Sequence, residues 1–332
     1  MRAVVITRPG GPEVLELRDV PAPEAGPGEI LVRVRAVGLN RADVLQRKGH
    51  YPAPEGVPSD IPGLEYAGEV VASGPIDPGF PDTRHLTPGT GVMGLVAGGA
   101  CAEYLVAPAV TAIAVPSGWG WEAAAAVPEV FLTAYDALVR QMRLAAGETV
   151  LVHAVSSGVG TAAVQLVKAW GACCLGTSRS ADKLARALAL GLDAAIDTSR
   201  EDVAEAVRRE TGGGGVDLVL DLVGGPLFEG SVKALANGGR MIVVGLTGGR
   251  SAPLDLGALL NKRLTIVGTT LRSRPTAEKA ALARDFEREV LPLFGAGRLR
   301  PVLDRTFPMA EVAEAHRVME ANEHFGKLVL AW

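Results

Sequence analysis

The residues with the most chemical information lie between Val150 and Gly171. An apolar run, Val150–Val152, is followed by small residues and then by a predicted amphipathic helix, Gly160–Trp170. A strand that ends in a tight turn before a helix offers free N–H groups and a positive dipole end to a pyrophosphate. The glycine pattern of such turns is incomplete here, because Val155 and Ser157 occupy the first two glycine positions. The predicted pyrophosphate-binding residues are Ser157, Gly158, Val159 and Gly160.

The strand that follows this helix predicts which dinucleotide binds. It ends in Gly176-Thr-Ser-Arg-Ser180, where folds that prefer NAD place an acid for the ribose hydroxyls. Hydroxyl and cationic groups instead suit the 2′-phosphate of NADPH. The alternative is that Arg179 and Lys183 only form the solvated start of a helix. We expect NADPH, held by Ser178, Arg179, Ser180 and Lys183.

The surrounding chain alternates apolar strands with amphipathic helices, which is typical of a parallel sheet covered on both faces. Glycine-rich turns follow two later strands, at Asp221–Gly225 and Val244–Gly249. The carboxyl ends of parallel strands form the ligand crevice of a doubly wound sheet, although ordinary tight turns also explain these glycines. We therefore expect an α/β fold with a Rossmann-type sheet, in which Gly245 and Leu246 contribute to cofactor binding.

The chain on either side of this region has a different character. Up to about residue 120 it contains short strands separated by Gly/Pro turns, and it shows no long helical period. The tail ends in a predicted helix, Ala310–Ala321, and a predicted strand, Gly326–Ala331, and so resembles the first region. We expect a nucleotide-binding domain at residues 122–295, inserted into a β-rich domain made of residues 1–121 and 296–332.

The bulk composition narrows the class of protein. The 332 residues are 48% hydrophobic and carry a formal net charge of −4, which gives no electrostatic reason to expect nucleic acid or an anionic membrane as a partner. No leader-like segment follows Met1, so we expect a cytoplasmic protein. Cys101, Cys173 and Cys174 lack the spacing of a disulfide framework and read as buried thiols.

Several blocks resemble one known family. Asn40-Arg-Ala-Asp-Val-Leu-Gln-Arg-Lys-Gly-His-Tyr51, Pro62-Gly-Leu-Glu-Tyr-Ala-Gly68 and the Val150–Gly171 stretch look like medium-chain dehydrogenase/reductases. Leu271-Arg-Ser-Arg274 and the tail from Met319 to Val329 fit the zeta-crystallin-like quinone oxidoreductase branch. The resemblance covers essentially the whole chain. It implies a Rossmann domain inserted into a GroES-like catalytic domain.

The same resemblance predicts that no metal takes part. Zinc alcohol dehydrogenases of this superfamily have a catalytic Cys where this chain has Asn40, and a metal-binding His where it has Leu64. Asn is a poor zinc ligand and Leu is none. The loop at Gly74–Pro88, which corresponds to the structural zinc lobe, contains no Cys. Hydride transfer would then need an easily reduced acceptor rather than a Lewis acid.

The resemblance also implies an activity and a set of site residues. It favours an NADPH-dependent quinone oxidoreductase, with reduction of enones or 2-alkenals as the alternative and a non-enzymatic NADPH- or RNA-binding protein as the alternative of another class. The catalytic candidates are Asn40, Tyr51 and Asp43, although Asn40–Asp43 could be only a helix cap and Tyr51 an aromatic closing a Pro-rich loop. The further cofactor-binding candidates are Thr133, Leu271, Arg272, Phe325, Gly326 and Lys327.

The last apolar strand of the predicted parallel sheet, Leu264–Thr270, would lie at the sheet edge. An apolar edge strand can pair with its copy across a two-fold axis. Together with the resemblance, this predicts a homodimer.

Overall fold

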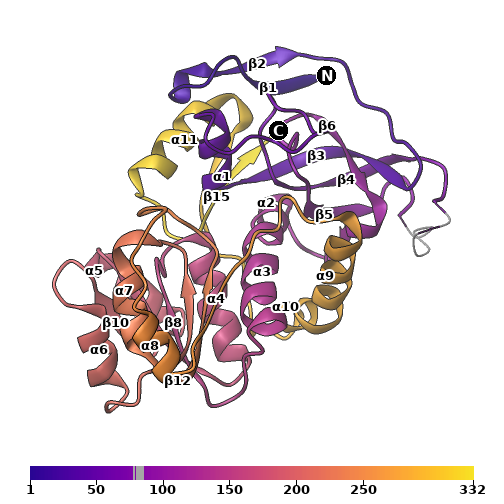
Figure 1. Ribbon diagram of the computed structural model, residues 1–332. Helices are drawn as coiled ribbons and strands as arrows, with labels where there is room; N and C mark the ends of the chain where they lie inside the picture. Colours follow the sequence, from indigo (N-terminus) through magenta and orange to yellow (C-terminus); the bar gives the residue numbers. More distant parts are fainter. Residues whose placement is uncertain (78, 80–85) are drawn as a thin grey trace. The chain divides into compact units, whose positions relative to one another are not determined.

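A computed structural model describes residues 1–77, 79 and 86–332 of the chain (Figure 1). The described chain forms two compact units. The strand-rich unit contains Met1–Leu132, Leu271–Pro292 and Pro301–Trp332, and the nucleotide-binding unit contains Thr133–Thr270 and Leu293–Arg300. The predicted domain boundaries, 121/122 and 295/296, remain a prediction. His85 and part of the cysteine-free loop at Gly74–Pro88 lie outside the described residues.

The strand-rich unit is built on a mixed sheet with the order β14-β15-β3-β4-β5-β7, in which β6 also pairs with β3. The two ends of the chain meet in this sheet, because Leu328 to Ala331 of β15 pair antiparallel with Leu39 to Ala36 of β3. The C-terminal strand therefore completes the N-terminal sheet, as the sequence predicts. The strands are β3 (Glu29–Leu39), β4 (Glu65–Ser73), β5 (Gly91–Leu95), β6 (Tyr104–Pro108), β7 (Ile113–Ala114), β14 (Leu303–Pro308) and β15 (Lys327–Ala331), beside a hairpin of β1 (Arg2–Ile6) and β2 (Leu15–Asp19).

The nucleotide-binding unit contains a six-stranded sheet with the order β10-β9-β8-β11-β12-β13. Every pairing in it is parallel. Counted from β8, this is the order 3-2-1-4-5-6 of the doubly wound nucleotide-binding fold, and it confirms the predicted fold class. The strands are β8 (Thr149–Val152), β9 (Cys173–Ser178), β10 (Ala194–Asp197), β11 (Val216–Asp221), β12 (Leu235–Val243) and β13 (Thr265–Gly268), and the helices between them are α4 (Gly158–Ala169), α5 (Ala181–Ala189), α6 (Val203–Glu210), α7 (Gly225–Ala234) and α8 (Leu256–Asn261).

The remaining helices depart from the predicted pattern at prolines. The apolar stretch at Glu122–Arg143 forms α2 (Trp121–Ala125), α3 (Pro128–Tyr135) and a π-helical turn (Asp136–Gln141), because Pro128 begins a new helix. The predicted helix Ala277–Phe294 is likewise divided, and Pro292 lies in its second part. The first region, which shows no long helical period, contains the seven-residue helix α1. Besides α2 and α3, the helices that do not connect strands of the parallel sheet are α1 (Arg41–Arg47), α9 (Thr276–Glu289), α10 (Leu291–Gly295) and α11 (Val312–Ala321).

Each unit has its own apolar core. In the strand-rich unit the core includes Val32, Val34 and Tyr66, and in the nucleotide-binding unit it includes Leu151, Val219 and Met241. None of the helices in the described part of the chain is both long and apolar enough to cross a membrane.

Candidate active site and cofactor-binding turn

The turn between β8 and α4 keeps the geometry of a pyrophosphate-binding turn although Val155 and Ser157 replace the first two glycines of the pattern. Ser157 caps α4, and its hydroxyl oxygen accepts a hydrogen bond from Gly160 N at 3.1 Å. A Cβ atom on Gly160 would lie 2.5 Å from Ala154 O and 2.7 Å from Val155 O, so only glycine fits there. The N–H groups of Gly158 and Val159 open the helix and have no helical carbonyl to donate to. The turn therefore keeps the donors that a pyrophosphate needs.

Val155, which replaces the first glycine, is accommodated by a glycine on the neighbouring strand. Val155 is fully buried, and its N–H donates to Thr177 O at 3.0 Å. A Cβ on Gly176 would lie 2.7 Å from Val155 Cγ2 and 2.8 Å from Leu192 Cδ1. The glycine lost from the turn is thus matched by one on β9.

The residues predicted to select NADPH lie at the end of β9. Ser180 caps α5, and its N–H donates to Ser178 Oγ at 3.2 Å. Arg179 is exposed, and Lys183 is half-buried in the first turn of α5. Because β8 and β9 run parallel, these residues share a sheet edge with the Ser157–Gly160 turn. No acid occupies the tip of β9.

Two other predicted cofactor residues of this unit follow β12, and a third lies on α3. Gly245 and Leu246 follow β12 at the same carboxyl edge of the sheet, and the Leu246 side chain is 47% exposed. Thr133 is buried on α3.

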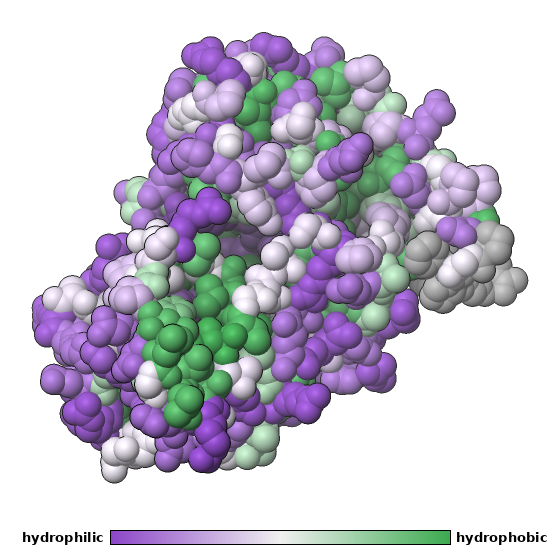
Figure 2. All heavy atoms as spheres, in the orientation of Figure 1, coloured by the Kyte–Doolittle hydropathy of each residue, from purple (hydrophilic) through white to green (hydrophobic). Residues whose placement is uncertain are grey.

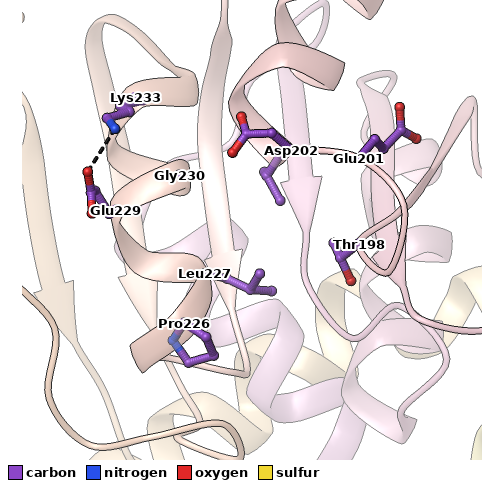
Figure 3. Close-up of a pocket in the computed structure, with 9 residues that line it drawn as sticks. Thr198, Glu201, Asp202, Pro226, Leu227, Glu229, Gly230 and Lys233 are labelled. Atoms are coloured by element: carbon purple, nitrogen blue, oxygen red, sulfur yellow. Dashed lines mark hydrogen bonds and ion pairs between the residues drawn. The ribbon is translucent and has the colours of Figure 1, made fainter.

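A pocket of about 320 Å³ opens elsewhere in this unit, between the start of α6 and α7 (Figure 3). Glu201, Asp202 and Glu229 line it, and Lys233 pairs with Glu229 at 2.7 Å. None of the predicted site residues lines this pocket. Its carboxylates would repel a phosphate.

In the strand-rich unit, the predicted Asn40 and Lys327 form a buried polar cluster with Glu65. Lys327 Nζ donates to Leu39 O at 2.9 Å, to Asn40 Oδ1 at 2.8 Å and to Glu65 Oε1 at 2.5 Å. Asn40 Nδ2 donates to Glu65 Oε1 at 2.8 Å and to Gly38 O at 3.1 Å. Lys327 is 3% exposed and Glu65 is fully buried. The Asn40 amide is thereby fixed in one orientation by charged partners.

Asp43 anchors the start of α1 beside this cluster. Its carboxylate accepts from Asn40 N at 2.7 Å, as in a capping box, and from Gly63 N at 3.0 Å. Both oxygens therefore serve backbone groups. Burial raises the pKa of Asp43 to about 6, against the opposing effect of these two hydrogen bonds. The helix-cap interpretation of Asn40–Asp43 is thus correct for Asp43, whereas the Asn40 amide turns into the cluster.

Glu129, which sequence reasoning missed, is the third carboxyl group of this region. Its backbone N–H donates to Glu65 Oε2 at 2.8 Å, so α3 is tied to the cluster. Burial, and then the charge of Glu65, raise the pKa of Glu129 to about 8. The protonated form of this carboxyl group is thereby favoured. In the sequence, Glu129 follows Pro128 at the start of a helix. An acid at this position is equally explained by its favourable interaction with the helix dipole, so the sequence alone does not mark it as a site residue.

Tyr51 and Arg272 form a second group in the strand-rich unit. The Arg272 guanidinium carbon lies 4.9 Å from the centroid of the Tyr51 ring, and Arg272 Nη1 donates to Tyr51 O at 3.1 Å. Arg272 Nε donates to Ala97 O at 2.7 Å and Nη2 to Gln46 Oε1 at 2.6 Å. The remaining predicted residues of this unit are buried; they are Leu271, Phe325 and Gly326.

The positions that hold zinc in metal-dependent relatives do not fit a metal ion here. The Asn40 amide is engaged by Lys327, Glu65 and Gly38, and Leu64 is apolar and 2% exposed. Across residues 1–77, 79 and 86–332, no three His, Cys, Asp or Glu side chains form a group that could hold a metal.

Comparisons with known proteins agree with this fold. The alcohol dehydrogenase GroES-like domain matches residues 26–117, and the zinc-binding dehydrogenase family matches residues 158–286. A quinone oxidoreductase of Pseudomonas aeruginosa is 38% identical over 323 residues, which cover 97% of this chain and 96% of that protein. The chain belongs to the medium-chain dehydrogenase/reductase superfamily. It is an oxidoreductase that uses a nicotinamide cofactor.

Other members of the superfamily are similar over different shares of their length. Human quinone oxidoreductase is 31% identical over 337 residues, which cover 99% of this chain and 97% of that protein. The pikromycin polyketide synthase component PikAII of Streptomyces venezuelae is 38% identical over 328 residues, and the chain spans only 8% of its length.

Solved structures of the superfamily superpose on the whole chain. A mycobacterial protein, Rv1454c, complexed with NADPH, has a TM-score of 0.90 at 30% identity and covers 100% of both chains. An NAD-dependent alcohol dehydrogenase has a TM-score of 0.85 at 35% identity, again over 100% of both chains. The CurK enoyl reductase has a TM-score of 0.86 at 26% identity over 99% of this chain and 98% of that one.

Proposed function

We propose that this protein is a zinc-independent, NADPH-dependent quinone oxidoreductase. The observation that carries the proposal is the similarity, from end to end, to two proteins named quinone oxidoreductases. The residues at the zinc positions support it, because Asn40 and Leu64 leave the hydride acceptor without a Lewis acid. An acceptor that is reduced without such help, as a quinone is, suits this site.

In this proposal the nicotinamide supplies the hydride, and the protein binds and orients both reactants. The N–H groups at the start of α4 hold the pyrophosphate, and the end of β9 holds the 2′-phosphate. We propose that the Tyr51 hydroxyl holds the acceptor and that Asn40, whose two amide N–H groups donate to Gly38 and Glu65, lines the site beside it. Asp43 acts through Asn40, because both of its oxygens are engaged by the backbone.

The preference for NADPH is tested by fluorescence titration. Lys183→Ala is expected to weaken NADPH binding about tenfold, the loss of roughly one charge-assisted hydrogen bond, and to leave NADH binding unchanged. Lys233→Ala is the matched control, because Lys233 is an exposed lysine of the same unit that pairs with Glu229. Equal affinity of the wild-type protein for NADPH and NADH would refute the proposed role of Arg179 and Lys183.

Reduction of activated double bonds is the second candidate function, favoured by the similarity to the CurK enoyl reductase. NADPH consumption is compared with ortho- and para-quinones and with trans-2-alkenals. Faster turnover of the alkenals would replace the first proposal by the second. Turnover of neither would favour a non-enzymatic NADPH- or RNA-binding protein.

We also propose a homodimer formed through the nucleotide-binding unit. β13 lies at the edge of the parallel sheet. Three leucines that precede β13 in the chain are exposed: Leu246 by 47%, Leu256 by 68% and Leu260 by 76%. Figure 2 shows hydrophobic residues gathered where Figure 1 places α8. A copy pairing along β13 would cover such a patch. Light scattering tests this: a dimer is expected for the wild type and a monomer for Leu256→Asp/Leu260→Asp, and a monomeric wild type would end the idea.

A further inference from the structure

Arg272 is a buried cation whose contacts are neutral. Arg272 is only 7% exposed. Its guanidinium donates to three neutral acceptors, which are the carbonyl oxygens of Ala97 and Tyr51 and the amide oxygen of Gln46. Taking a guanidinium out of water without a carboxylate in direct contact is costly. Such an arrangement calls for an explanation other than fold stability alone.

The three acceptors lie on separate parts of the strand-rich unit. Gln46 is on α1, Tyr51 lies in the loop after it, and Ala97 follows β5. Gln46 also donates from Nε2 to Ser59 O at 3.0 Å, which ties the far end of the Tyr51 loop to the same helix. Arg272 is therefore the point at which these segments are joined.

The loop that Arg272 holds has little structure of its own. No helix or strand lies between α1, which ends at Arg47, and β4, which begins at Glu65. An irregular loop keeps one position only where outside contacts offset its conformational entropy. Arg272 supplies two such contacts to Tyr51: a hydrogen bond to its carbonyl and a cation–π contact with its ring.

Arg272 is itself held in place. Lys279 Nζ, from α9, donates to Arg272 O at 2.7 Å. The fork of the guanidinium fits three acceptors in fixed directions, which an ammonium group does not reproduce.

We propose that Arg272 is a positioning residue that fixes the Tyr51 side chain for the reaction. This differs from direct contact with the cofactor, because the guanidinium donates to Tyr51, Gln46 and Ala97. The inference rests on the proposed function only in its kinetic consequence. The effect on Tyr51 itself is independent of any turnover.

The first test therefore follows Tyr51 without a substrate. The four tyrosines of the chain are labelled as 3-fluorotyrosine, and the fluorine resonance of Tyr51 is assigned by its loss in Tyr51→Phe. In Arg272→Met this resonance is expected to narrow and to move toward its position in unfolded protein, while the other three stay unchanged. Arg18→Met, which removes an exposed arginine paired with Glu16, is the matched control and should leave all four unchanged.

A second variant keeps the test decisive if Arg272→Met does not fold. Gln46→Leu removes one of the three acceptors and is expected to shift the Tyr51 resonance in the same direction by a smaller amount. Arg272→Lys should restore part of the wild-type signal. An unchanged Tyr51 resonance in these variants would overturn the proposal.

The kinetic test uses the wild-type reaction with a quinone. Arg272→Met is expected to lower kcat about tenfold to a hundredfold, as misplacement of a reacting group does, with the affinity for NADPH unchanged. In a Tyr51→Phe background the same substitution should have little further effect, because both act through one group. Weaker NADPH binding with an unchanged Tyr51 resonance would instead assign Arg272 to the cofactor. Absence of quinone turnover in the wild type would refute the proposed function alone.

Discussion

Removal of the buried ammonium group of Lys327 tests the polar cluster that fixes Asn40. Lys327→Met replaces the charge by an apolar chain of similar length. Glu65, which is fully buried, would keep hydrogen bonds from Asn40 Nδ2 and Glu129 N but lose the cation bonded to its carboxylate. Breaking one partner of a buried ion pair costs about 3–5 kcal/mol, because the other charge remains uncompensated. We expect this loss in the free energy of unfolding, measured by urea denaturation.

The double variant separates the pair from its surroundings. Glu65→Gln removes the stranded charge, so Lys327→Met/Glu65→Gln should be less destabilised than the sum of the single variants, by about 1–3 kcal/mol. Lys233→Met is the matched control, since its exposed pair with Glu229 should contribute no more than about 0.5 kcal/mol. A loss below about 1 kcal/mol for Lys327→Met, or strict additivity in the double variant, would refute the reasoning.

Three further perturbations follow from the structure. The pKa of Glu129 is raised to about 8, so protonation of this carboxyl group stabilises the folded state. The stabilisation is complete below the pKa that Glu129 has in the unfolded chain, and it is lost as pH rises toward 8. Urea denaturation at pH 5 and pH 8.5 should show that loss in the wild type and a smaller one, by about 2 kcal/mol, in Glu129→Gln. Gly176→Ala should cost about 1–3 kcal/mol through overpacking against Val155, and Val155→Gly in the same chain should recover much of it, as followed by thermal unfolding. Ser157→Ala should cost about 0.5–2 kcal/mol through loss of the α4 cap, read from the same melts.

Each of these expectations has an outcome that contradicts it. Parallel pH profiles for the wild type and Glu129→Gln would mean that this carboxyl group is not protonated at neutral pH. If Val155→Gly deepened the defect of Gly176→Ala, the two positions would not be matched. A Ser157→Ala variant as stable as the wild type would mean that its hydroxyl does not cap the helix.

Local patterns were sufficient to predict the nucleotide-binding sheet. Apolar strands and amphipathic helices alternate through it, and consecutive strands are neighbours in the sheet except β10 and β11. The incomplete glycine pattern was harder to interpret. The space that Val155 needs is provided by Gly176 on the next strand, and nothing in the turn itself indicates that pairing.

Neither the polar cluster nor the contacts of Arg272 could be predicted, because the residues involved are far apart in the chain. Lys327 lies 288 residues after Leu39, whose carbonyl it contacts, and Arg272 lies 226 residues after Gln46. The family resemblance suggested that both cations bind the cofactor. Their burial and their neutral or acidic protein partners were accessible only from the folded chain, where solvent is excluded and each donor needs a specific acceptor.

The most direct test of the account is NADPH consumption with a para-quinone by protein dialysed against a metal chelator. The rate should equal that of untreated protein, exceed the rate with a trans-2-alkenal, and exceed the rate with NADH in place of NADPH. A protein that reduces no quinone, or one whose quinone reduction disappears with the chelator and returns with zinc, would contradict the proposal of a zinc-independent quinone oxidoreductase.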